Sequence, residues 1–163
     1  MLAIDLATAI PIVDRHTRAL DAARQIAGSQ LPGLVVADET GRPVAVISAV
    51  DVLRLLVPDY ILEDMSLAGV FDELGAEDVW SSGSERLIGE LLDDHDTRVS
   101  DILEVDADAT LVEIAAQMAD ARGQVALLRG GETTEPRFVT LPAVMDAVLR
   151  VGGRVEGPDE TDR

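Results

Sequence analysis

The sequence predicts an α/β fold built from two similar small units. Residues 43–57 run from a β-branched apolar segment straight into a segment with helical spacing of its leucines. The same succession of segments returns 92 residues further along the chain. A length of 163 residues with 47% hydrophobic content leaves room for one compact domain or two small halves with a real core.

The first half contains signals for two helices and three extended segments after a short helical lead-in. Pro11 keeps the apolar residues around it out of a helix, and Pro58 ends the last helix. Thr17 is the expected N-cap of the helix that ends near Gly28. In order, the expected elements are a lead-in helix (2–8), an extended piece (10–13), a helix (19–27), a strand (34–37), a turn (38–41), a strand (44–47) and a helix (49–57).

Ser48 stands at the junction between the second strand and its helix, and two interpretations of it remain open. Ser48 and Asp51 have the spacing of a capping box, in which the serine and the acidic side chain close the first turn of the helix. The free N–H groups and the dipole of a helix start also favour an anion, so a phosphate could bind at the same place.

The second half repeats this plan. Under the shift of 92, Val13 falls on Val105 and Ile47 falls on Val139. The expected elements are a capping box from Thr110 to Glu113, strands over 125–128 and 138–140, and a last helix that starts near Pro142. Units of this size cannot bury both faces of a sheet alone, so we expect them to pack with a pseudo-twofold relation and to form binding clefts between them.

The segment between the halves is acidic and helical. Its apolar spacing predicts one amphipathic helix behind Ser66 and another behind Ser84, joined by a turn at 81–83. Residues 58–96 hold twelve acidic residues against Arg86 alone, so the outer faces of this segment are expected to be solvated or docked on something basic. The predicted organisation is therefore a first repeat with its lead-in (1–57), an acidic helical insert (58–98), a second repeat (99–151) and a flexible tail (152–163).

Composition excludes several classes of function. A net charge of −18 repels nucleic acids and anionic membranes, and only four aromatic residues are present to stack on bases. The chain has no cysteine and no lysine, and it has two histidines, so an obvious nucleophile or metal constellation is missing. The acidic run 93–96 is interpreted as a solvated linker and no metal is expected. No signal peptide or membrane span is recognised, and the expected location is the cytoplasm.

Taken together, these residues resemble a tandem pair of cystathionine-β-synthase (CBS) domains, also called a Bateman module. The resemblance covers about residues 9–57 and 99–150 and leaves the insert unexplained. The stretch 45–51, Ala-Val-Ile-Ser-Ala-Val-Asp, resembles the family's nucleotide motif G-h-x-[S/T]-x-x-D, with Ala45 where glycine is usual. The other matching stretches are 17–23, 31–36 and 38–44.

The resemblance implies a β-α-β-β-α fold in each half and adenine nucleotides or S-adenosylmethionine in the cleft between the halves. Carried over to this chain, Ser48 faces phosphate or ribose and Asp51 takes the ribose hydroxyls. Ile102 and Leu103 would line the adenine, and Arg122 is the proposed phosphate partner, with a solvated surface arginine as the alternative.

The second motif departs from the pattern. Thr140 keeps the hydroxyl, but Ala143 stands where the ribose-binding aspartate would be and Arg137 where glycine is usual. Loss of a carboxylate acceptor weakens nucleoside binding, so we expect one competent site at most.

The sequence therefore favours a non-catalytic regulatory module. It would sense AMP, ADP, ATP or S-adenosylmethionine as a regulatory ligand, require no cofactor, form a homodimer through its helices and signal to a separate transporter or metabolic enzyme. The alternative is a ligand-free interaction or dimerisation module whose pocket is degenerate, which the substitutions at positions 45, 137 and 143 favour.

Overall fold

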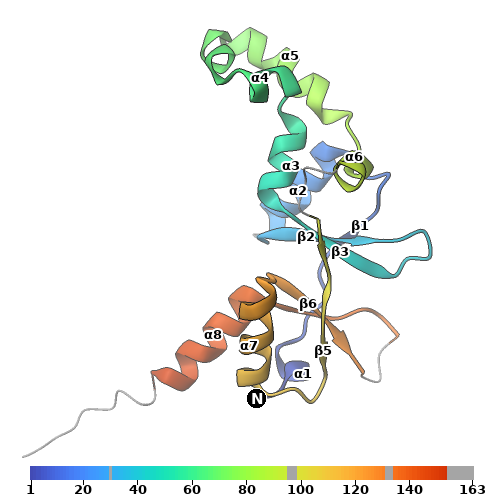
Figure 1. The fold of residues 1–163 in the computed structure, drawn as a ribbon, viewed down its shortest axis with the longest axis vertical. Coiled ribbons are helices and arrows are strands. Elements are labelled where there is room, and N and C mark those ends of the chain that lie inside the picture. Colours follow the sequence, from blue (N-terminus) through green and yellow to red (C-terminus); the bar gives the residue numbers. More distant parts are fainter. Residues whose placement is uncertain (30, 95–98, 131–133, 154–163) are drawn as a thin grey trace, which may run out of the picture. The chain divides into compact units, whose positions relative to one another are not determined.

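The computed structural model describes residues 1–29, 31–94, 99–130 and 134–153, which form two compact units (Figure 1). The first-repeat unit comprises Pro11–Ile102, and the second-repeat unit comprises Met1–Ile10 together with Leu103–Arg163. Each is a small mixed α/β unit with its own sheet, which confirms the predicted fold class.

The first-repeat unit has the expected β-α-β-β-α order. The elements are β1 (Ile12–Val13), α2 (Ala19–Ser29), β2 (Gly33–Ala37), β3 (Pro43–Ser48) and α3 (Ala49–Leu56). Its sheet has the order β1-β2-β3-β4, where β4 is Ser100–Asp101; β1 is parallel to β2, and the other pairs are antiparallel. In the β2–β3 turn the Asp38 carboxylate accepts hydrogen bonds from the hydroxyl and backbone N–H of Thr40 and from the N–H of Arg42. These bonds, that from the Thr40 hydroxyl above all, lower the pKa of Asp38 and fix the hairpin register.

The second-repeat unit repeats this order. Its elements are α1 (Ala3–Leu6), β5 (Leu103–Asp106), α7 (Leu111–Ala121), β6 (Val125–Arg129), β7 (Phe138–Thr140) and α8 (Leu141–Gly152). The sheet order is β5-β6-β7, with β5 parallel and β7 antiparallel to β6. Thr110 caps α7 and forms the predicted capping box with Glu113.

The N-terminal lead-in belongs to the second-repeat unit, which differs from the linear boundary of 1–57 expected for the first repeat. Thr8 pairs with Phe138 as Ser100 pairs with Val46, and these positions are equivalent under the shift of 92. The segment just before the second repeat thus pairs with the edge of the first-repeat sheet, and the segment just before the first repeat pairs with the edge of the second-repeat sheet. Ala3 is fully buried in the second-repeat core, so burial rather than chain order decides the assignment of residues 1–10.

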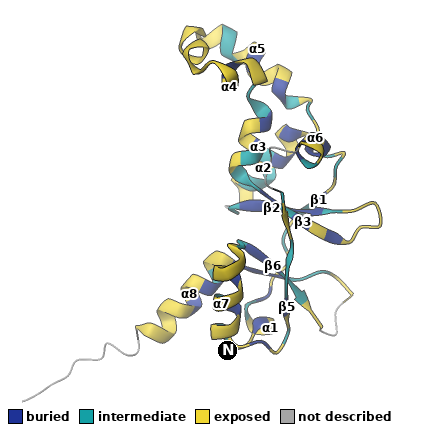
Figure 2. Cartoon of the chain, in the orientation of Figure 1, coloured by how far each residue is buried: buried dark blue, intermediate teal, exposed yellow. Residues whose placement is uncertain are grey.

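Each unit has one apolar core between its sheet and its helices, as the distribution of buried residues shows (Figure 2). The first-repeat core includes Leu34, Val36, Ile47, Val52 and Ile88. The second-repeat core includes Val105, Ile114, Met118, Val139 and Val144. These aliphatic residues are the ones that the strand and helix periodicities place inward.

The insert is helical as predicted, but its helices begin and end elsewhere. It contains α4 (Asp59–Glu63), the 3-10 helix η1 (Met65–Val70), α5 (Glu73–Ser84) and α6 (Ile88–Asp93). The predicted turn at 81–83 is wrong, because these residues form the last turn of α5 and the chain leaves the helix at 85–87. The predicted helix behind Ser66 is also interrupted, because Asp72 begins a new helix by accepting a hydrogen bond from the N–H of Gly75. The last part of the insert, α6, packs into the first-repeat core.

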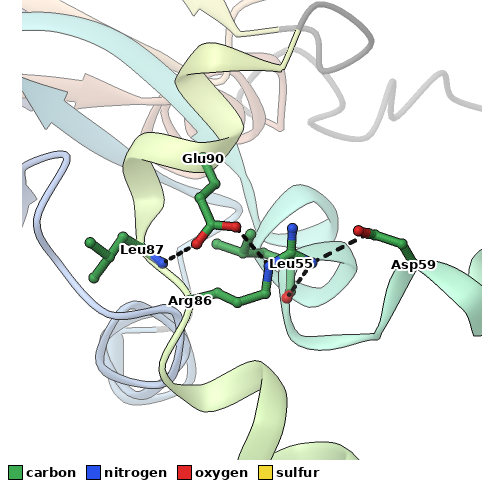
Figure 3. Close-up of polar contacts among 5 residues, drawn as sticks. All are labelled: Leu55, Asp59, Arg86, Leu87 and Glu90. Carbon is green, nitrogen blue, oxygen red and sulfur yellow. Dashed lines mark hydrogen bonds and ion pairs between the residues drawn. The ribbon is translucent and has the colours of Figure 1, made fainter.

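Arg86 fastens the insert to the end of α3 (Figure 3). Its guanidinium donates to Glu90 at 2.8 Å, to Asp59 at 3.3 Å and to the carbonyl oxygen of Leu55 at 3.4 Å. Partial burial lowers the pKa of Arg86, but the hydrogen bond and charge of Glu90 and the charge of Asp59 outweigh it and raise the pKa overall. Arg86, the one arginine among residues 58–94, therefore has a structural role.

Candidate functional site

Ser48 and Asp51 lie together where β3 meets α3, and their geometry is that of a complete capping box. The Ser48 Oγ accepts a 3.1 Å hydrogen bond from the backbone N–H of Asp51 and donates one of 2.6 Å to Oδ2 of Asp51. The Ser48 N–H donates to the same Oδ2 at 3.3 Å. The capping interpretation of these residues is thus confirmed.

The capping box leaves one carboxylate oxygen of Asp51 uncommitted. Its hydrogen bonds all use Oδ2, and Oδ1 accepts none within the part of the chain that the structure describes. Both side chains are half-buried, so solvent reaches the junction. A carboxylate that is held by the helix start and still open on one side is an acceptor for hydroxyl groups.

The position of Ser48 depends on Gly33 across the hairpin. Gly33 pairs with Ser48 in the β2–β3 register. A Cβ at position 33 would overlap the carbonyl oxygen of Ile47 and lie 3.3 Å from the Cα of Ser48. Glycine is therefore required here by the close approach of the two strands.

The corresponding junction of the second repeat has the hydroxyl without the carboxylate. Thr140 is the N-cap of α8 and its Oγ1 accepts a 3.4 Å hydrogen bond from the N–H of Ala143. Thr140 is only 7% exposed, and Val125 stands opposite it where the first repeat has glycine. Arg137 donates to the carbonyl oxygen of Ala7, so this departure from the motif is used to hold the N-terminal segment.

The other predicted site residues divide between the units. Ile102 is half-buried at the end of the first-repeat unit, where its N–H donates to the carbonyl oxygen of Val44. Leu103 begins β5 in the second-repeat unit and lies next to Gly123. Arg122 precedes that glycine as the C-cap of α7, in the left-handed conformation with φ of 51°.

Arg122 is exposed, and within the described residues it has neither an ion pair nor a side-chain hydrogen bond. Most other described arginines do have such a partner, as the chain holds 31 acidic residues. Its guanidinium is consequently available to an anion that comes from solvent.

A cavity of about 700 Å³ lies at the opposite end of the first-repeat sheet from Ser48. It is bordered by the end of β1 and the β2–β3 turn and includes Asp14, Arg15 and His16. The sequence pattern contains no signal for this hollow. Arg15 is held there by an ion pair of 2.8 Å with Asp93, which belongs to the acidic run. No group of three or more metal-ligating side chains occurs in the part of the chain described, and the rest of that run, 95–96, lies outside it.

Comparison with known proteins agrees with this architecture. Residues 3–58 match the model of the CBS domain family. The structure of a CBS domain-containing protein of unknown function from Kribbella flavida is similar to this one. The match covers 91% of this chain and 99% of that protein, with 29% sequence identity and a TM-score of 0.73. The CBS-pair protein CBSX2 from Arabidopsis thaliana is similar over 93% of this chain and 96% of its own, with 17% identity and a TM-score of 0.62.

A second structure of CBSX2, in complex with AMP, gives a TM-score of 0.58 at 17% identity and covers 93% of this chain and 98% of its own. No curated protein sequence matches the chain. Among the described helices, none is long and apolar enough to cross a bilayer. Residues 3–58 thus match the CBS domain family, and the chain as a whole has the fold of a CBS-domain pair.

Proposed function

We propose that this CBS-domain pair is a non-catalytic regulatory module that binds an adenine nucleotide through the β3–α3 junction of its first repeat. The observation that carries the proposal is the half-buried Ser48–Asp51 pair at the start of α3, with Oδ1 of Asp51 uncommitted. The ribose hydroxyls are the groups that this carboxylate would accept, and the helix start favours the phosphate.

Two further observations support a nucleotide as the ligand. CBSX2, which shares this fold, has been solved in complex with AMP. Arg122 is an exposed cation without an ion partner among the described residues, which suits the phosphate contact proposed for it. Ile102 and Leu103 offer aliphatic surface for the adenine and remain proposed contacts.

The second junction is proposed to bind a nucleotide weakly or not at all. Thr140 is buried and is the only polar side chain of the pair, because Ala143 supplies no acceptor for ribose hydroxyls. One nucleotide per chain is the expected stoichiometry.

Helix α3 offers a route from this site to a partner. Ser48 caps its start and Asp51 lies in its first turn, and its last residues contact Gly83 and Arg86 of the insert. A nucleotide that binds one arrangement of α3 better than another would shift the insert with it, and a separate partner protein would read that shift.

The test is a thermal-shift and calorimetric screen of AMP, ADP, ATP and S-adenosylmethionine. Stabilisation should appear with at least one of them and disappear in Asp51→Ala. The matched control is Glu113→Ala, which removes the acidic half of the other complete capping box, in the second repeat. Both variants lose a helix cap, but only the first should lose nucleotide binding.

A ligand that stabilises Asp51→Ala as much as the unaltered chain would refute the site. If none of the four ligands binds, the alternative function, an interaction or dimerisation module without a ligand, replaces the proposal. The loss of the motif glycine at Ala45 and of the second aspartate at Ala143 is what favours that alternative.

We also propose that the chain forms a homodimer through its helices. The last helix, α8, exposes an apolar stripe at helical spacing, formed by Leu141, Met145, Val148 and Leu149. The helix α3 exposes Leu53, which is equivalent to Met145 under the repeat shift. Exposed apolar residues in line on a helix are typical of a face that packs on another helix.

A further inference from the structure

The helical insert contains an apolar groove in its exposed part, formed where α4, η1 and α5 meet. The groove has a volume of about 300 Å³, and its lining includes Ile61, Met65, Phe71 and Trp80. Trp80 is 49% exposed and Met65 is 68% exposed, although large apolar side chains usually gain by burial. Figure 2 shows these helices as largely exposed, in contrast to the cores of the two repeats.

This groove concentrates the aromatic side chains of a chain that has few. The sequence has one tryptophan, one tyrosine and two phenylalanines. The tryptophan and one of the phenylalanines line the groove. Tryptophan and other aromatic residues are enriched at the centres of protein interfaces, where a few of them supply most of the binding energy.

The segment that forms the groove carries an acidic border, in which Asp59 and Glu85 pair with arginines and the other acidic residues form no ion pair with the described residues. Residues 58–85 contain eight acidic residues and no arginine. Four of the eight, Glu63, Glu73, Glu77 and Asp78, have no ion pair or side-chain hydrogen bond within the described chain. Glu73 and Glu77 precede Trp80 in α5 by seven and three residues, so they lie on the same helix face as the tryptophan.

From this combination we infer that the insert groove is a docking site for a basic amphipathic segment of a partner protein, whose apolar face enters the groove while its Lys or Arg residues face the acidic border. The volume is at the lower end of the range of about 300–1,000 Å³ for ligand pockets, which fits one or two large side chains of a helix. The charge complementarity selects the occupant. A second copy of this chain would bring two unpaired acidic borders together, and an anionic membrane would repel them.

The single tryptophan makes the inference directly testable. The probe is a tryptophan-free peptide with Leu and Lys on opposite faces of a helix. Its binding should exclude water from around Trp80 and shift the fluorescence emission of Trp80 to shorter wavelength. The shift should saturate at micromolar peptide concentrations. Raising the salt concentration about tenfold should weaken the affinity at least tenfold, because screening removes the electrostatic part.

Two peptide controls separate specific docking from the general electrostatic attraction of a basic peptide to an acidic protein. A scrambled peptide of identical composition should bind at least tenfold more weakly and leave the Trp80 emission unchanged. A peptide with Glu in place of Lys should not bind. Equal effects of the designed and scrambled peptides would overturn the inference, as would the absence of any shift.

Two variants test the groove itself. The double change Glu73→Gln with Glu77→Gln should weaken the designed peptide at least fivefold, whereas the matched pair Asp108→Asn with Asp120→Asn, on the second repeat, should leave its affinity within twofold. Met65→Ser should also weaken binding without unfolding the chain, since Met65 is mostly exposed. A shift of Trp80 emission that depends on protein concentration alone would identify a second copy as the occupant and refute the inference.

Discussion

Gly83 in α5 lies against the backbone of Leu56 at the end of α3, so closely that a Cβ at position 83 would overlap the carbonyl oxygen of Leu56. The same Cβ would lie 2.7 Å from the carbonyl carbon, and backbone atoms cannot yield as a flexible side chain can. This contact, together with Arg86, fixes the insert to the helix that begins at Ser48.

Gly83→Ala should therefore destabilise the chain by about 1–3 kcal/mol, through overpacking at this crossing. The free energy of unfolding in urea measures the effect. Gly28→Ala is the matched control, because Gly28 is also helical and a Cβ there would meet nothing within 4 Å. The free energy of unfolding of that control should rise by about 0.5–1 kcal/mol, because alanine has a higher helix propensity than glycine. Equal stability of the two variants would contradict the close contact.

Glu90 provides a pH-dependent test of the Arg86 network. Partial burial raises the pKa of Glu90, but the hydrogen bonds from Arg86 and from the N–H of Leu87 outweigh it and bring the pKa below the ordinary 4.5. A carboxylate with a lowered pKa in the folded state stabilises the fold above its unfolded pKa, and that contribution is lost as the pH falls through its folded pKa.

Glu90→Gln should consequently cost about 0.5–1 kcal/mol near pH 7, a modest value because the side chain is partly exposed. The difference from the unaltered chain should shrink as the pH falls below 4.5 and disappear once Glu90 is protonated. Urea unfolding over a pH series measures it. Glu39→Gln, in the exposed β2–β3 turn, is the control and should show little difference at any pH. A cost that persists unchanged in acid would mean that the ion pair is not its source.

The second junction offers a gain-of-stability test. Thr140 caps α8 but has alanine at the third helical position, where the first repeat has Asp51. Ala143→Asp should complete the capping box and stabilise the chain by about 0.5–1 kcal/mol at neutral pH. Chemical denaturation measures the gain, and Ala143→Asn should gain less because it lacks the charge. A loss of stability in Ala143→Asp would show that burial around Thr140 outweighs the cap.

The sequence predicted best what is decided locally. The strand and helix order of both repeats, the turn at Asp38 and the capping box of Ser48 and Asp51 depend on residues within a few positions of one another, and they are found as expected. The capping box is also the part of the candidate site that sequence reasoning located, because its two side chains are three residues apart.

The remaining features depend on contacts between distant segments, which periodicity cannot supply. Residues 1–10 join the second repeat through the pairing of Thr8 with Phe138 and the burial of Ala3. The sequence of residues 81–83 predicts a turn, but these residues are helical. The absence of a side chain at Gly83 lets this part of α5 pack directly on the backbone of Leu56. The contacts proposed for Ile102, Leu103 and Arg122 likewise involve residues far from Ser48 in the chain and await the nucleotide experiment.

The proposed homodimer predicts that charges on the exposed stripe of α8 separate the protomers. Met145 is 57% exposed and Leu149 is 70% exposed, so neither supports the core of its own unit. The double change Met145→Glu with Leu149→Glu should leave the unfolding free energy of the monomer nearly unchanged, since the substituted side chains already face solvent. It should convert a dimer into a monomer at protein concentrations of about tens of micromolar, because burying two unpaired carboxylates per chain costs more than the interface gains.

Sedimentation velocity measures both states, and Gln117→Glu on the exposed side of α7 controls for added charge. The control should remain dimeric. A monomer in the unaltered chain, or a dimer that survives both substitutions in α8, would exclude this helix as the contact between copies.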